Sequence, residues 1–197
     1  MPRLDGNTAS LARKALMGTA LLALAGCGGG GFFSGKTAEE KAKDAAFACP
    51  RVGIVRELSE VVQFRPGKGR EPGDVVSHGV LSDYNGNCEY RDDGVTVNVA
   101  VTLLAERGPA LAGSQAKYRY FVAVVPPGAE PTGGSKREFD TTVDFASGQT
   151  RAGNREELSQ TIPLPKDANA KDWRIYIGFQ LSNEELAFNR AALVRSK

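Results

Sequence analysis

The sequence is poor in the residues from which metal and catalytic sites are usually built. It contains one histidine, His78, three cysteines and no Cys-x-x-Cys pair, so the familiar sets of zinc ligands are missing. No Gly-x-Ser-x-Gly turn, which positions the nucleophile of many hydrolases, occurs in the chain. We therefore expect no metal ion and no cofactor, and the sequence nominates no catalytic residue. A catalytic pair brought together only by folding would leave no such signal.

A long apolar run is also missing. About eleven uncharged residues run from Ala15 to Ala25, whereas a helix needs about twenty apolar residues to cross the hydrocarbon core of a membrane. Arg13 and Lys14 precede this run, and small residues follow it. A basic start, a short apolar middle and a small-residue exit are typical of a secretion signal rather than of a permanent transmembrane helix.

The exit of this run, Leu24-Ala25-Gly26-Cys27, resembles the lipobox of bacterial lipoprotein precursors, in which a leucine and two small residues precede a cysteine. The resemblance implies that residues 1–26 are cleaved off as a signal peptide, that the Cys27 thiol is acylated, and that Cys27 becomes the first residue of the mature protein. Such lipoproteins typically carry two or three acyl chains, and an anchor of more than one chain is lasting. An ordinary signal peptide followed by a chance cysteine is the alternative.

The residues after Cys27 bear on where the protein would lie. In enteric bacteria an aspartate at the next position retains a lipoprotein in the inner membrane, and here that position is Gly28. By this analogy we expect a lipid-anchored, periplasm-facing protein, with the outer membrane favoured. Residues 27–47 are expected to form the lipidated cysteine and a tether that is flexible or partly helical, since Thr37 and Glu40 have the spacing of a capping box.

Charges of the two signs balance once the signal segment is removed. The full chain has 25 Lys and Arg against 23 Asp and Glu, and residues 1–26 contain three of the former and one of the latter, which leaves 22 of each. A neutral chain has no basic field that would attract nucleic acid, so we expect no nucleic-acid partner. The expected partners are the membrane, through the lipid at Cys27, and an envelope protein or glycan.

Two cysteines remain after lipidation of Cys27. In an oxidising compartment we expect Cys49 and Cys88 to form a disulfide. Closing a loop of about forty residues would stabilise the fold by roughly 4 kcal/mol in the chain-entropy model. Two unpaired, buried cysteines are the alternative.

From about Cys49 onward, apolar residues alternate with polar ones, which is typical of half-buried strands. The clearest examples are VTVNVAVTL from Val95, EFDTTVDF from Glu138, ELSQTIPL from Glu157 and WRIYIGFQL from Trp173. Residues 121–125 are apolar at every position, which predicts a central strand covered on both faces. Weaker strands are expected near 51–64 and 75–90.

Two Gly-containing pairs compete for the hairpin turn before Val95. These are Asn85-Gly86 and Asp93-Gly94, both favourable for positive φ. The even-numbered Val76, Val80, Tyr84, Cys88 and Tyr90 are all compatible with one face of a single long strand. We therefore predict that the strand runs through Asn85 without a slip in register and turns at Asp93-Gly94.

About eight strands with short connections predict an all-β fold. The expected architecture is a single antiparallel β-sandwich over residues 48–197, immunoglobulin-like in the broad sense, with a short C-terminal helix. Ser182 and Glu185 have capping-box spacing at the start of this helix. The helix would either pack on the sandwich or present its apolar residues to a partner.

Four local patterns suggest chemistry, and each has a simpler structural explanation. Asp83 to Glu89 places oxygen ligands at alternate positions but lacks the glycine and the final glutamate of a calcium loop. Ser114 and Lys117 have the Ser-x-x-Lys spacing of penicillin-recognising enzymes but precede a strand rather than start a helix. His78 lies between strand residues. The basic, glycine-rich loop Arg65–Gly73 would either be solvated or touch anionic envelope material.

Two functions remain open. The favoured one is a lipid-anchored, non-enzymatic binding or assembly module of the cell envelope. The alternative is a periplasmic hydrolase that acts on envelope material, with an active site assembled from several loops.

Overall fold

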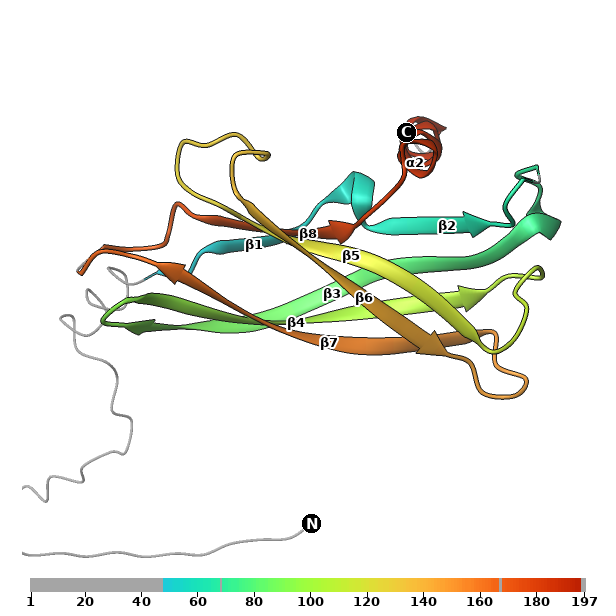
Figure 1. Ribbon diagram of the computed structural model, residues 1–197, viewed down its shortest axis with the longest axis horizontal. Helices are drawn as coiled ribbons and strands as arrows, with labels where there is room; N and C mark the ends of the chain where they lie inside the picture. Colours follow the sequence, from blue (N-terminus) through green and yellow to red (C-terminus); the bar gives the residue numbers. More distant parts are fainter. Residues whose placement is uncertain (1–47, 68, 167, 196–197) are drawn as a thin grey trace, which may run out of the picture. The chain divides into compact units, whose positions relative to one another are not determined.

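A computed structural model describes residues 48–67, 69–166 and 168–195 of the chain. Two four-stranded sheets pack face to face, and one helix follows the last strand (Figure 1). The expected all-β sandwich with a short C-terminal helix is confirmed. The elements are β1 Arg51–Ile54, η1 Arg56–Leu58, β2 Glu60–Phe64, η2 Pro72–Asp74, β3 Val75–Arg91, β4 Gly94–Arg107, β5 Gln115–Val125, β6 Ser135–Asp144, β7 Arg151–Pro163, β8 Arg174–Phe179 and α2 Asn183–Arg195.

The strand order is β1-β8-β5-β6 in one sheet, called sheet A here, and β2-β3-β4-β7 in the other, called sheet B. Every neighbouring pair is antiparallel except β1 and β8, which run parallel. The sandwich is thus dominated by antiparallel pairs, as expected, and the pair β1–β8 at this edge departs from that pattern. The region 51–64, where weaker strands are expected, contains β1 and β2, and η1 between them carries the chain from the edge of sheet A to the edge of sheet B.

The core lies between the sheets and follows the predicted alternation. In β4 every odd-numbered residue from Val95 to Ala105 is buried and faces sheet A. On sheet A, the residues that face the core are the even-numbered residues of β5 together with Ile175, Ile177 and Phe179 of β8. Full burial of such a side chain is worth about 1.5–3 kcal/mol, so these two rows dominate the stability of the sandwich.

Strand β3 does not keep one parity along its length. Its buried residues in the first half are Ser77, Gly79 and Leu81, whereas Cys88 and Tyr90 pack against the core in the second half. A β-bulge between Leu81 and Asp83 inserts one unpaired residue and exchanges the two faces. The prediction of a strand without a slip is wrong for this reason.

The predicted position of the hairpin turn is confirmed. Strand β3 continues through Gly86, where a Cβ would lie 2.2 Å from the carbonyl oxygen of Asn98, so only glycine fits. The chain turns after Arg91, which pairs with Gly94, and Gly94 has a φ of +150°. A side chain at Gly94 would be strained.

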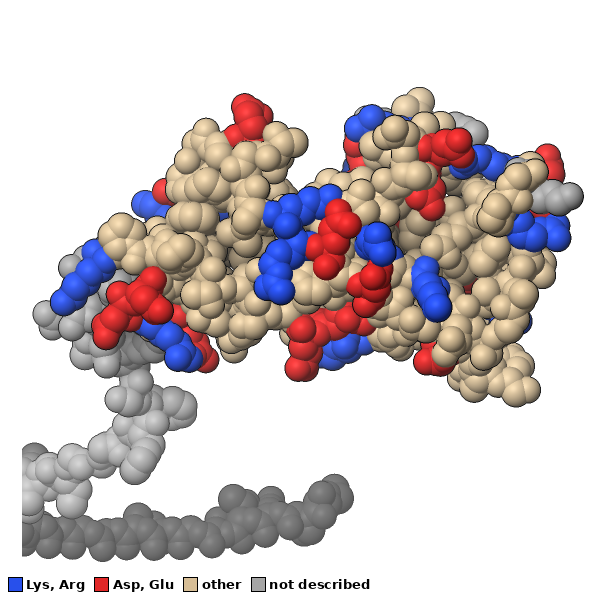
Figure 2. All heavy atoms as spheres, in the orientation of Figure 1, with Lys and Arg blue, Asp and Glu red and all other residues tan. Residues whose placement is uncertain are grey.

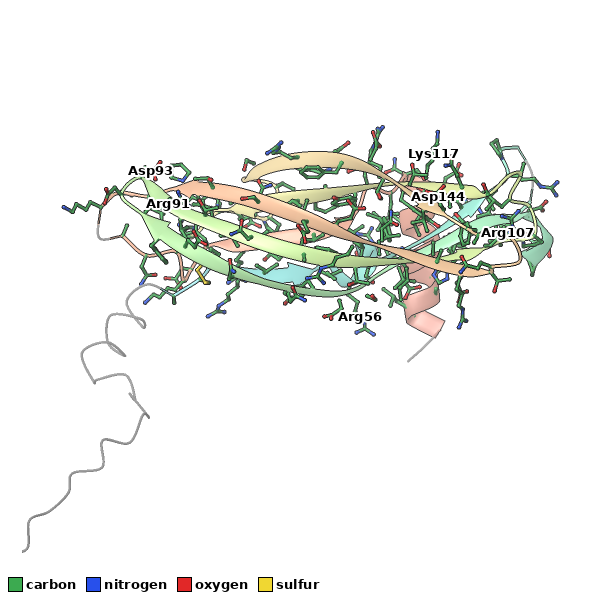
Figure 3. All side chains as sticks on the ribbon, turned by 90° about the horizontal axis from the view of Figure 1, so that it is seen from below. Arg56, Arg91, Asp93, Arg107, Lys117 and Asp144 are labelled. Atoms are coloured by element: carbon green, nitrogen blue, oxygen red, sulfur yellow. A yellow bond between two sulfur atoms is a disulfide. The ribbon has the colours of Figure 1, made fainter. Side chains whose placement is uncertain are left out.

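The start of the domain is fastened to β3. Cys49 and Cys88 form the expected disulfide, with their Cα atoms 5.7 Å apart. The Tyr90 hydroxyl donates to the carbonyl of Ala48 at 2.7 Å, and the Tyr84 hydroxyl donates to the carbonyl of Val52 at the same distance. Figure 3 shows the disulfide near the end of the sandwich that carries the labelled Arg91 and Asp93.

The C-terminal helix begins with the predicted capping box. The Ser182 backbone N–H donates to the Glu185 carboxylate at 2.7 Å, and the Glu185 N–H donates to the Ser182 hydroxyl at 3.2 Å. The side-chain amide of Asn189 donates to the carbonyls of Glu57 and Glu60, at 3.0 and 2.7 Å. The helix therefore packs on η1 and β2, which agrees with the expectation that it packs on the sandwich.

The predicted lipid attachment at Cys27 and the tether over 27–47 lie outside the described residues. Among the residues that are described, no helix combines the length and the apolar character needed to cross a membrane.

Candidate functional site

The outer face of sheet A carries an apolar groove. Phe121, Ala123 and Val125 of β5 point away from the core, yet each is at least nine-tenths buried. The prediction that this strand is covered on both faces is therefore confirmed. The cover is incomplete, since a cavity of about 600 Å³ remains above Phe121 and Ala123.

Three segments wall this groove. The β5–β6 loop contributes Pro131 and Thr132 on one side, and the end of β8 with α2 contributes Leu181 and Leu186 on the other. Figure 2 shows the hollow between two raised parts of the surface, which correspond to the β5–β6 loop and α2 in Figure 1. The third segment is η1, whose Leu58 lies directly over Gly178, where a Cβ would be only 2.8 Å from that of Leu58.

Lys136 is the cation on the rim of the groove. Its ammonium lies 4.7 Å from the centre of the Phe121 ring, in cation–π geometry. The same ammonium donates to the Gln180 side chain and lies 3.1 Å from the Glu138 carboxylate. These contacts hold Lys136 across the groove floor and neutralise part of its charge.

A second, polar cavity of about 490 Å³ adjoins the groove, and Pro131 and Tyr176 line both. It contains two arginines, Arg51 of β1 and Arg174 of β8, which are direct neighbours in the parallel register. No carboxylate of the described chain forms an ion pair with either guanidinium, although Asp172 also lines the cavity. Like charges side by side on neighbouring strands are destabilising, so this pair is suited to an external anion.

A separate polar cluster joins the edges of the two sheets. The Glu156 carboxylate of β7 accepts from the Thr141 hydroxyl at 2.6 Å and from the Tyr120 hydroxyl at 3.3 Å, while Asn154 donates to the carbonyl of Thr142 at 2.6 Å. Burial, followed by the nearby Glu156 charge, raises the pKa of Tyr120 well above its ordinary value. The cluster keeps the Tyr120 hydroxyl protonated as a hydrogen-bond donor, and its hydrogen bonds connect β6 to β7.

Sequence reasoning missed this cluster, although a signal was present. Glu156 is in phase with Leu158 and Ile162, which are apolar members of the predicted alternation in ELSQTIPL and are both buried. A carboxylate at a position in phase with buried residues needs a buried donor, and that requirement indicates a polar contact across the sheets.

His78 lies on the outer face of β3 and contacts acidic side chains. Its Nε2 is 3.1 Å from the Glu60 carboxylate, and its Nδ1 is 4.0 Å from that of Glu106. These neighbours are carboxylates rather than a hydroxyl nucleophile. Ser114 lies in the bend before β5 and Lys117 in the extended strand, so this pair lacks the helix on which its chemistry depends.

The acidic and amide residues from Asp83 to Glu89 lie along β3 rather than in a loop. Asp83 accepts from the backbone N–H of Tyr84, Asn85 accepts from Arg155, and Asn87 accepts from Asn98. Their oxygens therefore serve hydrogen bonds within the sheet. In the described ranges no group of three or more His, Cys, Asp or Glu side chains is placed to hold a metal ion.

The arginines of the loop Arg65–Gly73 contact the protein itself. Arg65 pairs with Asp74 at 2.5 Å, and Arg70 pairs with Glu184 of α2 at 2.8 Å. The Arg70 guanidinium also lies over the rings of Phe64 and Phe188, 5.4 and 5.9 Å from their centres. These contacts fasten the loop to α2 and leave the two arginines less available to an external anion.

One further pattern lies outside the described residues. Gly30 to Thr37 fits the Gly-x-x-x-x-Gly-Lys-Thr spacing of a phosphate-binding loop. That loop works between a strand and a helix, whereas the residues before it here are the short apolar run Ala15–Ala25, Cys27 and glycines. The pattern therefore lacks the context that gives it meaning.

Comparison of the chain with protein-family models, with curated proteins and with solved structures finds no match in any of the three.

Proposed function

We propose that this chain is a bacterial lipoprotein whose sandwich is a non-enzymatic binding module of the cell envelope. In this proposal Cys27 carries the lipid, residues 28–47 are the tether, and the domain faces the periplasm from the outer membrane. The lipobox-like sequence before Cys27 supports the anchor. The Cys49–Cys88 disulfide supports an oxidising compartment, where such bonds persist.

The apolar groove on sheet A is the observation that carries the binding role. Concave, mostly apolar cavities of about 300–1,000 Å³ are the usual form of ligand sites, and this groove falls within that range. The contacts of His78 and of the Ser114–Lys117 pair give no support to the hydrolase alternative, because neither assembles a nucleophile with a base.

The anchor is tested by replacing its cysteine. Cells that express the full chain are fed radiolabelled palmitate, and the protein is recovered from separated inner and outer membranes. We expect label on the wild-type chain in the outer membrane and none on Cys27→Ser. The matched control is the double variant Cys49→Ser/Cys88→Ser, which removes two other cysteines and should keep the label. An unlabelled wild-type chain, or one retained in the cytoplasm, overturns the anchor.

The binding role is tested with a photo-crosslinking residue placed in the full chain in intact envelopes. Position 132 on the groove wall should give adducts, whereas position 98 on the outer face of sheet B should not. Equal labelling at the two positions, or hydrolysis of peptidoglycan or ester substrates by the purified chain, would count against a binding module.

A further inference from the structure

We propose that the apolar groove and the arginine pair form one site for a lysophosphatidylethanolamine, a single acyl chain with a phosphoethanolamine headgroup. This inference rests on the proposed binding function and names its ligand. It combines two neighbouring cavities, one apolar and one charged, that lie along the same strand.

Strand β8 connects the two ends of this site. Arg174 lines the charged cavity, Tyr176 lines both, and Phe179 with Gln180 lines the apolar one. At about 3.3 Å per residue, six residues of extended chain place these ends about 20 Å apart. Pro131 of the β5–β6 loop also lines both cavities, so the loop borders a single path rather than separating two sites.

The apolar end fits an acyl chain. Its floor is formed by Phe121 and Ala123, and its far wall by Leu181 and Leu186. Lys136, the cation among the described residues that line this end, is held by Gln180 and Glu138. A hydrocarbon chain needs no hydrogen-bond partner, and it gains from leaving water. One such compartment adjoins the arginines, which favours one chain over two.

The charged end fits a headgroup with both signs of charge. Arg51 and Arg174 repel each other across neighbouring strands, and a phosphate between them would relieve that repulsion through charge-assisted hydrogen bonds. Asp172 lines the same cavity and would accept from an ammonium group. Phosphoethanolamine supplies one phosphate and one ammonium. A fatty-acid carboxylate or a phosphoglycerol group would supply an anion to the arginines but no ammonium group to Asp172.

The site is tested by photolabelling. The full mature chain, with whatever modification Cys27 carries, is placed in phosphatidylcholine vesicles with lysophosphatidylethanolamine that bears a diazirine at the end of its acyl chain. After irradiation, peptide mass spectrometry locates the adduct. We expect labelling within 121–136 and 176–186, and we expect unlabelled lysophosphatidylethanolamine to compete at least about ten-fold better than the phosphoglycerol or fatty-acid equivalents.

Matched variants separate the two ends of the site. Ala123→Trp, which fills the groove, should reduce the labelling about ten-fold, while Ala100→Trp on the outer face of sheet B should leave it unchanged. Thr132→Trp on the exposed rim is a second blocking variant if Ala123→Trp fails to fold. Arg51→Ala/Arg174→Ala should abolish the headgroup preference, whereas Arg56→Ala should keep it, because Arg56 points away from the sandwich (Figure 3). Asp172→Asn should equalise phosphoethanolamine and phosphoglycerol.

Three results would overturn the inference: adducts spread outside the groove, labelling that survives both blocking variants, or equal competition by every headgroup. None of these depends on acylation of Cys27. Groove labelling on a chain with an unmodified Cys27 would therefore keep the lipid site and overturn the anchor, and the reverse result would do the opposite.

Discussion

The outer faces of the two sheets differ in side chains and in cover. Around Thr96 and Asn98 the outer face of sheet B is polar, with hydrogen bonds such as Asn98 to Asn87 and a hydroxyl contact between Thr96 and Thr161. The outer face of sheet A is apolar at Phe121, Ala123 and Val125 of β5, where η1, α2 and the β5–β6 loop cover it. This polar stretch needs no cover because its side chains satisfy one another and water, whereas α2 packs only on β2 at the edge of the same sheet. On the apolar face, segments cover both sides of a groove. This difference is the reason the proposed binding site is on sheet A.

The largest difference should appear when one side chain is removed from each outer face. Phe121→Ala should destabilise the fold by about 3 kcal/mol, because the ring is buried beside Gly178 and under Lys136. Asn98→Ala on sheet B should change the free energy of unfolding by no more than about 0.5 kcal/mol. Denaturant unfolding measures both. Equal losses would show that the two faces are similarly packed.

A pair of glycines tests how tightly η1 covers sheet A. Gly178→Ala would place a Cβ 2.8 Å from that of Leu58 and 3.1 Å from the Phe121 ring, and we expect a loss of about 1–3 kcal/mol from overpacking. Gly53→Ala in β1 of the same sheet meets no atom within 4 Å and should be neutral or slightly stabilising. A neutral Gly178→Ala would mean that η1 moves freely away from the sheet.

Asn189 tests whether α2 is a fixed wall of the groove. Asn189→Ala leaves the carbonyls of Glu57 and Glu60 without this donor, and we expect a loss of about 1–2 kcal/mol. Amide hydrogen exchange over 183–195 should accelerate more than exchange in β4. Unchanged exchange in the helix would show that its other contacts, including the Phe64–Phe188 ring pair at 5.7 Å, suffice to hold it.

The smallest effect concerns the exposed part of sheet A beyond the groove. The Arg119 guanidinium donates to Asp140 at 2.7 Å and lowers the pKa of that carboxyl below 3.8. The contribution of this pair to folding stability is therefore present at pH values above the pKa of Asp140 in the unfolded chain. It is lost as the pH falls through the lower pKa of Asp140 in the folded protein. Arg119→Ala should raise the Asp140 titration midpoint measured by NMR. An unmoved midpoint would show that the pair does not persist in solution.

Much of this architecture could be predicted because the alternation in β4 and β8 has period two and both strands face one core. The disulfide and the capping box were predictable from local chemistry. The bulge in β3 was not, because valines and tyrosines of one parity conceal that Gly79 and Leu81 carry the inward face of the first half. The apolar run 121–125 predicted a covered strand. The groove itself depends on the β5–β6 loop and α2, which meet the strand only in the folded chain.

The bond between Cys49 and Cys88 determines how the domain would respond to a pull on the preceding chain. Without it, tension would reach β1 first and could peel its four residues from β8. With it, the load passes at Cys49 into β3, which pairs with β4 between Ser77 and Arg91 and with β2 between Val75 and Val80. Resistance would then come from the longest ladder of the sandwich, and Arg51 would keep its place beside Arg174 under strain.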